Sequence, residues 1–187
     1  MALIEKGVEH ELVPVDVFAE DGVPEWYLEF HPFGRIPAFA HGDLRFYETA
    51  AITRYVDEAF EGPDLQPAEP ADRARMSQII GMLDAYAYRP MVWEVAVERL
   101  EQTPPNEELI ALGLERAELA LKSLANLKSD GSWLLGDSIS LADLHAAAMI
   151  GYFTKVEEGR DLLSRHIQLQ SWFDLVTQRA SYLRTSS

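Results

Sequence analysis

The sequence contains no cysteine among its 187 residues. Without cysteine the chain cannot form a disulfide, use a thiolate of its own as a nucleophile, or bind a metal through sulfur. No apolar run approaches the roughly 18–20 residues that a membrane-spanning helix needs. Charged residues stand too close to Met1 for a secretory signal. We therefore expect a cytoplasmic protein with no membrane segment.

Positive charge is also scarce. The sequence contains 16 lysine and arginine residues and 31 aspartate and glutamate residues, which gives a formal net charge of −15. Binding nucleic acid requires clustered basic side chains that neutralise phosphates, so no nucleic-acid partner is expected. The five histidines are scattered, without the His-x-x-x-His spacing of a zinc helix. We expect no metal site.

The N-terminal third of the sequence has the pattern of a small mixed α/β domain. Residues 11–17 alternate apolar and polar side chains, which predicts a strand, and Pro14 places that strand at a sheet edge. The other predicted elements are a helix end at 3–6, a short helix over 24–30, a hairpin of 38–40 with 44–47, and a helix over 49–60.

The composition changes after residue 62. Residues 63–70 contain three prolines and no regular period, so we predict a linker there between a domain of residues 1–62 and a domain of residues 71–187. The second domain reads as all-helical. Its predicted helices cover 71–100, as one helix or two divided near Pro90, then 106–128, 140–153 and 169–179.

Two motifs carry a resemblance to a known family. Residues 33–39 read Phe-Gly-Arg-Ile-Pro-Ala-Phe, and residues 47–52 read Tyr-Glu-Thr-Ala-Ala-Ile. Together they resemble the glutathione-binding half of the glutathione transferases, and residues 136–144 resemble a motif of that family's helical domain. The resemblance, which is to phi-like and bacterial members, implies a thioredoxin-like N-terminal domain followed by an all-α helical bundle.

The resemblance implies that Ile36-Pro37 is a cis peptide bond. The backbone N–H and C=O of Ile36 would then face outward and bind the cysteinyl part of glutathione as a short added strand. The alternative is a trans proline that simply begins a strand. Arg35 would donate to the backbone or carboxylates of glutathione, or it is an exposed arginine with no such role.

Glu48 and Thr49 make the second half of the implied site. Thr49 is expected to be the N-cap of the following helix, whose free N–H groups and dipole suit the γ-glutamyl carboxylate. Glu48 would face the ammonium group of the ligand. The alternative is an ordinary capped helix with an exposed glutamate.

Three sites in the helical half have assigned roles. Tyr86 and Tyr88 are candidates for the electrophile pocket, although aromatic residues on helices are more often core. Ser140 and Asp143 have the spacing of a capping box. His145 is expected to be a core histidine rather than a base.

The family also places a first strand and a catalytic Ser, Tyr or Cys upstream of this region, and the printed sequence has neither. A start assigned too late, a truncation and a sheet repaired by another segment are all compatible with this. We expect a homodimeric glutathione transferase that joins glutathione to a small hydrophobic electrophile. A non-catalytic binding or assembly module, or a glutathione-dependent isomerase, dehalogenase or lyase, remains the alternative.

Overall fold

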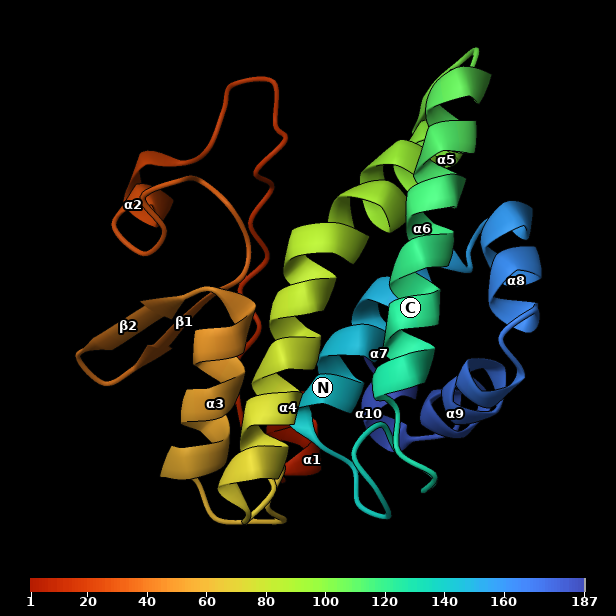
Figure 1. The fold of residues 1–187 in the computed structure, drawn as a ribbon. Helices are drawn as coiled ribbons and strands as arrows, with labels where there is room; N and C mark the ends of the chain where they lie inside the picture. Colours follow the sequence, from red (N-terminus) through yellow and green to blue (C-terminus); the bar gives the residue numbers. More distant parts are fainter. Residues whose placement is uncertain (187) are drawn as a thin grey trace. The chain divides into compact units, whose positions relative to one another are not determined.

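The computed structural model describes residues 1–186. The chain divides into two compact units, Ala2–Pro63 and the segment from Asp64 onward, coloured red to gold and gold to blue in Figure 1. Among the described residues, no helix has both the length and the apolar character needed to cross a membrane.

The first unit is built around a two-stranded hairpin. Its elements are α1 (Ala2–Glu5), α2 (Glu25–Leu28), β1 (Ala38–His41), β2 (Leu44–Tyr47) and α3 (Thr49–Ala59). The strands pair antiparallel, with Ala38 opposite Tyr47 and His41 opposite Leu44. Gly42 lies in the turn with a φ of 58°, a value that glycine adopts without steric cost. The predicted hairpin is therefore confirmed.

Residues 11–17 do not form the predicted strand. Residues 11–16 have no regular secondary structure, Val17 lies in a turn, and the sheet of the described residues contains β1 and β2 alone. An extended segment becomes a strand only through ladder bonds to a neighbour, and neither β1 nor β2 pairs with this one. Of the alternating apolar residues, Val13 is 57% exposed and Val15 and Val17 are half-buried, so none of them reaches the core.

A buried ion pair joins α1 to the end of α3. Lys6 Nζ donates to Asp57 Oδ1 and to the Pro63 carbonyl, each at 3.1 Å, and Lys6 is only 6% exposed. Gly62, at φ 130°, passes so close that a Cβ there would lie 2.7 Å from the Lys6 carbonyl oxygen. The chain therefore leaves α3 along a path that needs glycine.

The second unit is helical throughout. Its elements are α4 (Pro70–Met82), η1 (Leu83–Ala87), η2 (Arg89–Val97), α5 (Glu98–Glu101), α6 (Glu107–Leu127), α7 (Leu141–Phe153), α8 (Glu157–Ser164), α9 (Ile167–Thr177) and α10 (Ala180–Leu183). η1 and η2 are π-helical, with wider turns than an α-helix. Two short helices, α8 and α10, have no counterpart in the sequence prediction.

The helical run of α4, η1, η2 and α5 does not divide into two helices at Pro90, which corrects one of the two readings of residues 71–100. Pro90 is the second residue of η2, and Tyr88 just before η2 already has helical φ and ψ. The missing donor of the proline therefore falls inside a continuous helical run, in its π-helical stretch, where the ordinary ladder of i→i−4 bonds is interrupted in any case.

The start of α7 is fixed by a buried carboxylate. Asp143 Oδ2 accepts from the Ser140 backbone N–H at 2.8 Å and from the Ser140 hydroxyl at 2.7 Å, which confirms the capping box. Asp143 Oδ1 accepts from the Leu134 N–H and from Trp172 Nε1, both at 2.8 Å. Burial raises the pKa of Asp143, and these donors oppose the rise.

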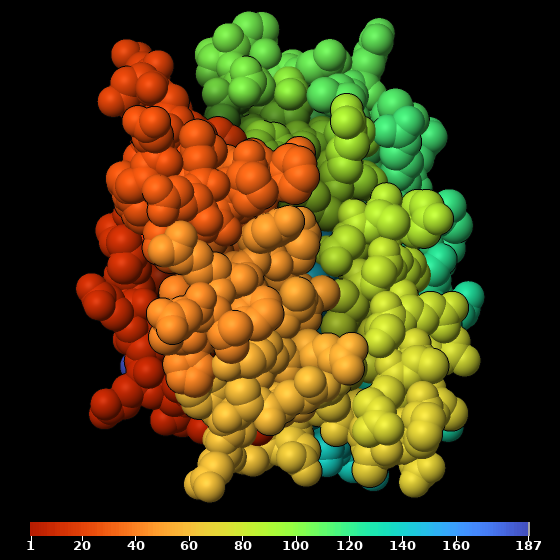
Figure 2. Space-filling view, turned by 90° about the vertical axis from the view of Figure 1, so that its left-hand side faces the viewer, coloured from red at the N-terminus to blue at the C-terminus, as the bar shows by residue number. Residues whose placement is uncertain are grey.

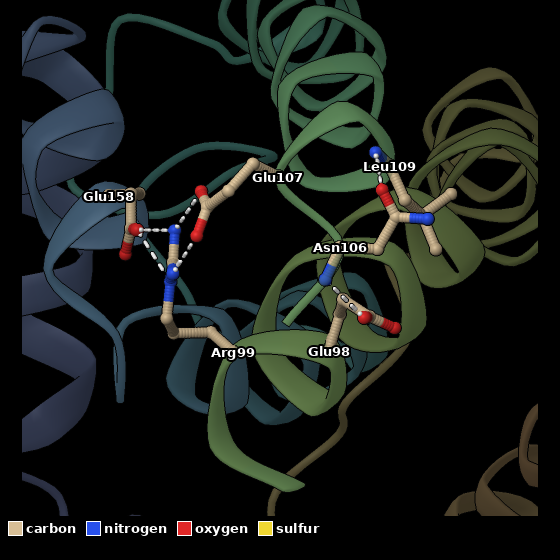
Figure 3. A network of polar contacts seen from close by, with 6 residues as sticks. All are labelled: Glu98, Arg99, Asn106, Glu107, Leu109 and Glu158. Atoms are coloured by element: carbon tan, nitrogen blue, oxygen red, sulfur yellow. Dashed lines mark hydrogen bonds and ion pairs between the residues drawn. The ribbon is translucent and has the colours of Figure 1, made fainter. Parts of the chain in front are cut away.

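A polar network joins α5, α6 and α8 (Figure 3). Arg99 Nη1 and Nη2 donate to the two carboxylate oxygens of Glu107 at 2.7 and 2.8 Å, and Arg99 Nε donates to Glu158 at 2.8 Å. Asn106, beside them, accepts the Leu109 N–H at 3.1 Å. Asn106 is therefore the N-cap of α6, as the sequence predicts.

Candidate glutathione site in the first unit

The hairpin brings the two sequence motifs to one end of the sheet. Ala38 and Tyr47 are opposite each other in the register. Pro37 directly precedes Ala38, and Glu48 directly follows Tyr47, so antiparallel pairing places these two residues side by side. Glu48 and Thr49 are exposed, and Figure 2 shows the orange to gold residues of β2 and α3 on the visible face.

Ile36 offers free backbone groups at this end. The Ile36-Pro37 peptide bond is cis, as predicted. Ile36 is 58% exposed, and within residues 1–186 no hydrogen bond of its N–H or C=O is found. Ile36 lies two residues before Ala38, where the paired part of β1 begins. A peptide ligand could therefore bond here as an added strand segment.

The N-terminus of α3 offers a second set of donors. The first backbone bond into this helix runs from the Ile52 N–H to the Glu48 carbonyl, so the preceding N–H groups of the first turn have no helical partner. No side chain caps them, and the first turn contains no acidic residue. Such a helix end suits a carboxylate.

One residue of this end differs from the prediction. Thr49, expected as the N-cap, is the first residue of α3, and Glu48 holds the N-cap position. The reason is the backbone of Glu48, which has φ 71° and ψ 117° and so cannot belong to the helix. The hydroxyl of Thr49 has no hydrogen-bond partner among residues 1–186 and stays available.

The backbone of Glu48 is itself unusual. Among the described residues it is the one non-glycine residue with a positive φ. A glutamate in this region costs roughly 1–3 kcal/mol and persists only where the surroundings impose it, which occurs most often at ligand sites. The sequence gives no signal of this conformation.

Arg35 supplies the positive charge of this region. Its side chain is exposed, and within residues 1–186 no hydrogen bond or ion pair of the guanidinium is found. In a chain with a net charge of −15, an uncompensated cation next to Ile36 is a local attraction for an anionic ligand.

Two buried residues of this unit were not singled out by the sequence. Tyr27, 5% exposed, donates its hydroxyl to the Arg35 carbonyl at 2.8 Å. His31, 3% exposed, packs its ring against Tyr47 with 4.8 Å between ring centroids. Tyr27 therefore contacts the residue before Ile36, and His31 contacts the residue before Glu48. No rule of sequence spacing predicts these two contacts.

Tyr86 and Tyr88 belong to the helical unit. Tyr86 lies in η1, and Tyr88 follows its last residue. Tyr86 is 71% exposed and Tyr88 44% exposed, so neither ring is a core side chain. Trp93, on η2, is 41% exposed. Their assignment to an electrophile pocket stays a prediction.

His145 lies on α7. Its side chain is 8% exposed, and its Nε2 lies 2.7 Å from Asp84 Oδ1. Its Nδ1 is buried without a partner among the described residues. The side chain is therefore enclosed, although only one of its two ring nitrogens has a hydrogen-bond partner.

In residues 1–186 there is no group of three His, Asp or Glu side chains arranged to hold a metal ion.

Known proteins share both halves of this arrangement. The family model described as glutathione S-transferase, N-terminal domain, matches residues 1–64, and that for the C-terminal domain matches residues 107–175. A glutathione S-transferase of Hyoscyamus muticus is 31% identical over 163 residues, covering 83% of this chain and 76% of the relative. One from Arabidopsis thaliana is 30% identical over 194 residues, covering 100% and 89%.

Solved structures agree. The crystal structure of a glutathione transferase from Populus trichocarpa superposes with a TM-score of 0.84 at 28% identity, covering 98% of this chain and 88% of that one. A glutathione S-transferase from Rhodospirillum rubrum gives a TM-score of 0.79 at 26% identity, covering 97% and 82%. The chain belongs to the glutathione S-transferase family, with the small sheet-containing N-terminal unit and the helical C-terminal unit of that fold.

Proposed function

We propose that this protein binds glutathione at the end of the hairpin and joins it, through its thiol sulfur, to a small hydrophobic electrophile. Family membership supports the activity. The observation that carries the site is the juxtaposition of two sets of unpaired backbone donors, those of Ile36 and those of the first turn of α3.

Each part of glutathione has a matching group in this proposal. The cysteinyl main chain bonds to the N–H and C=O of Ile36. The γ-glutamyl carboxylate takes the N–H groups at the start of α3 and the Thr49 hydroxyl, and the carboxylate of Glu48 faces the ammonium group. Arg35 attracts a carboxylate of the tripeptide.

The chemistry is a nucleophilic transfer. The thiol of glutathione gives its proton to water, and the thiolate sulfur then forms a bond to an electrophilic carbon. Either a leaving group departs with its electron pair, or a multiple bond takes up the pair and is then protonated by water. No described residue is assigned the role of lowering the pKa of the thiol. Tyr86 and Tyr88 are proposed to contact the electrophile through their exposed rings.

We also propose a cytoplasmic homodimer. The sequence contains no cysteine, which fits a reducing compartment. Sedimentation at micromolar concentration measures the association directly: a dimer is expected, and a compact monomer would contradict this part of the proposal.

Two measurements on the same protein test the function. Calorimetry with glutathione should give saturable binding, and a thiol-conjugation assay with an aromatic halide electrophile reports transfer. Binding with transfer supports the enzyme. Binding without transfer would instead identify a glutathione-binding module, and absence of binding would refute the site.

A further inference from the structure

The hydroxyl of Tyr27 bonds the backbone next to Ile36, in the proposed ligand site. It donates to the carbonyl oxygen of Arg35 at 2.8 Å, and the residue is only 5% exposed. Within residues 1–186 no other side chain bonds to the backbone of residues 34–37. The Tyr27 phenol is therefore the one side chain that fixes the backbone of this segment by a hydrogen bond in the described part of the chain.

This contact fixes the direction of a donor on the other side of the peptide group. The Arg35 carbonyl and the Ile36 N–H belong to the same planar trans peptide unit, in which the C=O and N–H point in opposite directions. Because Tyr27 holds the carbonyl toward the interior, the Ile36 N–H points away from it, toward the exposed side.

Burial raises the pKa of Tyr27, and the nearby backbone N–H of Ala38 opposes that rise. The hydroxyl of Tyr27 is therefore enclosed beside the segment whose backbone it bonds.

Tyr27 is itself held in place. Its carbonyl accepts the N–H groups of Phe30 at 2.9 Å and His31 at 3.0 Å, and the Gly34 N–H donates to the His31 carbonyl at 2.9 Å. The short connection from α2 to Arg35 is therefore cross-linked by backbone bonds. The His31 ring in turn packs against Tyr47, the residue before Glu48.

From this geometry we propose that Tyr27 is a positioning residue for glutathione. It does not touch the ligand. Its hydroxyl sets the orientation of the Ile36 backbone before the ligand arrives, and a donor that is already oriented binds more tightly than one that must be ordered on binding. The proposal rests on the proposed function, because the ligand is glutathione in both.

Tyr27→Phe tests the idea, since it removes the hydroxyl and keeps the ring. We expect a loss of glutathione affinity of about three- to tenfold by calorimetry, the effect of loosening about one hydrogen bond. The matched control is Tyr55→Phe in the same unit, whose hydroxyl lies 2.8 Å from His41 Nδ1 on β1. Its affinity should stay within about twofold of the unchanged protein.

Unfolding midpoints of both variants separate positioning from general destabilisation. Equal affinity in Tyr27→Phe and the unchanged protein would overturn the proposal, and so would an equal loss of affinity in Tyr55→Phe.

A second readout does not depend on binding. The amide NMR shift of Ile36 should move in Tyr27→Phe without ligand, and an unmoved shift would also overturn the proposal. If the unchanged protein fails to bind glutathione, the proposed function is refuted and the Ile36 amide shift alone decides the role of Tyr27.

Discussion

Replacing Arg116 by glutamine should destabilise the helical unit far more than an equivalent change on the surface. Glu94, on η2, is 3% exposed. Arg116 Nη1, on α6, lies 3.0 Å from both carboxylate oxygens of Glu94. Arg89 Nε lies 3.0 Å from one of these oxygens. Arg116→Gln removes the cation from a carboxylate that water reaches poorly.

The magnitude follows from these contacts. Hydrogen bonds to a charged group are worth about 1.5–3 kcal/mol. Arg116 is half exposed, with 51% of its side chain accessible, and Arg89 remains, so we expect the lower part of that range, about 1.5–2 kcal/mol. For a chain of this size each kcal/mol moves the unfolding midpoint by about 2–4 °C. The expected fall is about 3–8 °C.

The control is Arg54→Gln. Arg54 Nε bonds Glu58 at 2.8 Å, but the two side chains are 68% and 52% exposed, and such a pair contributes only about 0.3–0.5 kcal/mol. Its midpoint should fall by less than about 2 °C in the same calorimetric or circular-dichroism scan. Equal shifts for Arg116→Gln and Arg54→Gln would refute the reasoning that burial of Glu94 sets the strength of its pairing.

Three further predictions concern single residues. Thr49→Ala should weaken glutathione binding by about ten- to hundredfold in calorimetry, because it deletes a hydrogen bond to a charged carboxylate; unchanged affinity would contradict the site. Asn106→Ala should lower stability by about 1 kcal/mol in denaturant unfolding, because the Leu109 N–H loses its cap; an unchanged midpoint would contradict the cap. Hydrogen bonding to Arg99 lowers the pKa of Glu107 below its ordinary value of 4.5, so this pair stabilises above that pH and the effect is lost on acidification. Thermal midpoints between pH 6 and pH 3 should therefore fall less steeply in Glu107→Gln, and an identical slope would contradict this.

The features that the sequence predicts correctly are those specified by neighbouring residues. Asn106 caps a helix because its side chain reaches the N–H three residues on. Ser140 and Asp143 bond each other across one turn, and the hairpin forms around a two-residue turn. In each case the residues that cause the structure lie within a few positions of it.

The features that the sequence misses depend on contacts between distant residues. Residues 11–17 have a strand pattern, but a strand also needs a neighbour to pair with, and no pattern within the segment shows whether one is present. The positive φ of Glu48 is imposed by its surroundings. The Tyr27 hydroxyl bonds the Arg35 carbonyl, eight residues further along the chain. The loop between them follows a path that residue propensities for helix, strand or turn do not specify.

The most direct test of the central claim is an amide NMR titration of the protein with glutathione. If the hairpin end is the site, the amide signals of Ile36 and of residues 49–51 should shift together along one saturable curve, with the same dissociation constant that calorimetry gives. The account would be contradicted if these signals stayed fixed while glutathione bound, or if the shifting signals lay elsewhere in the chain.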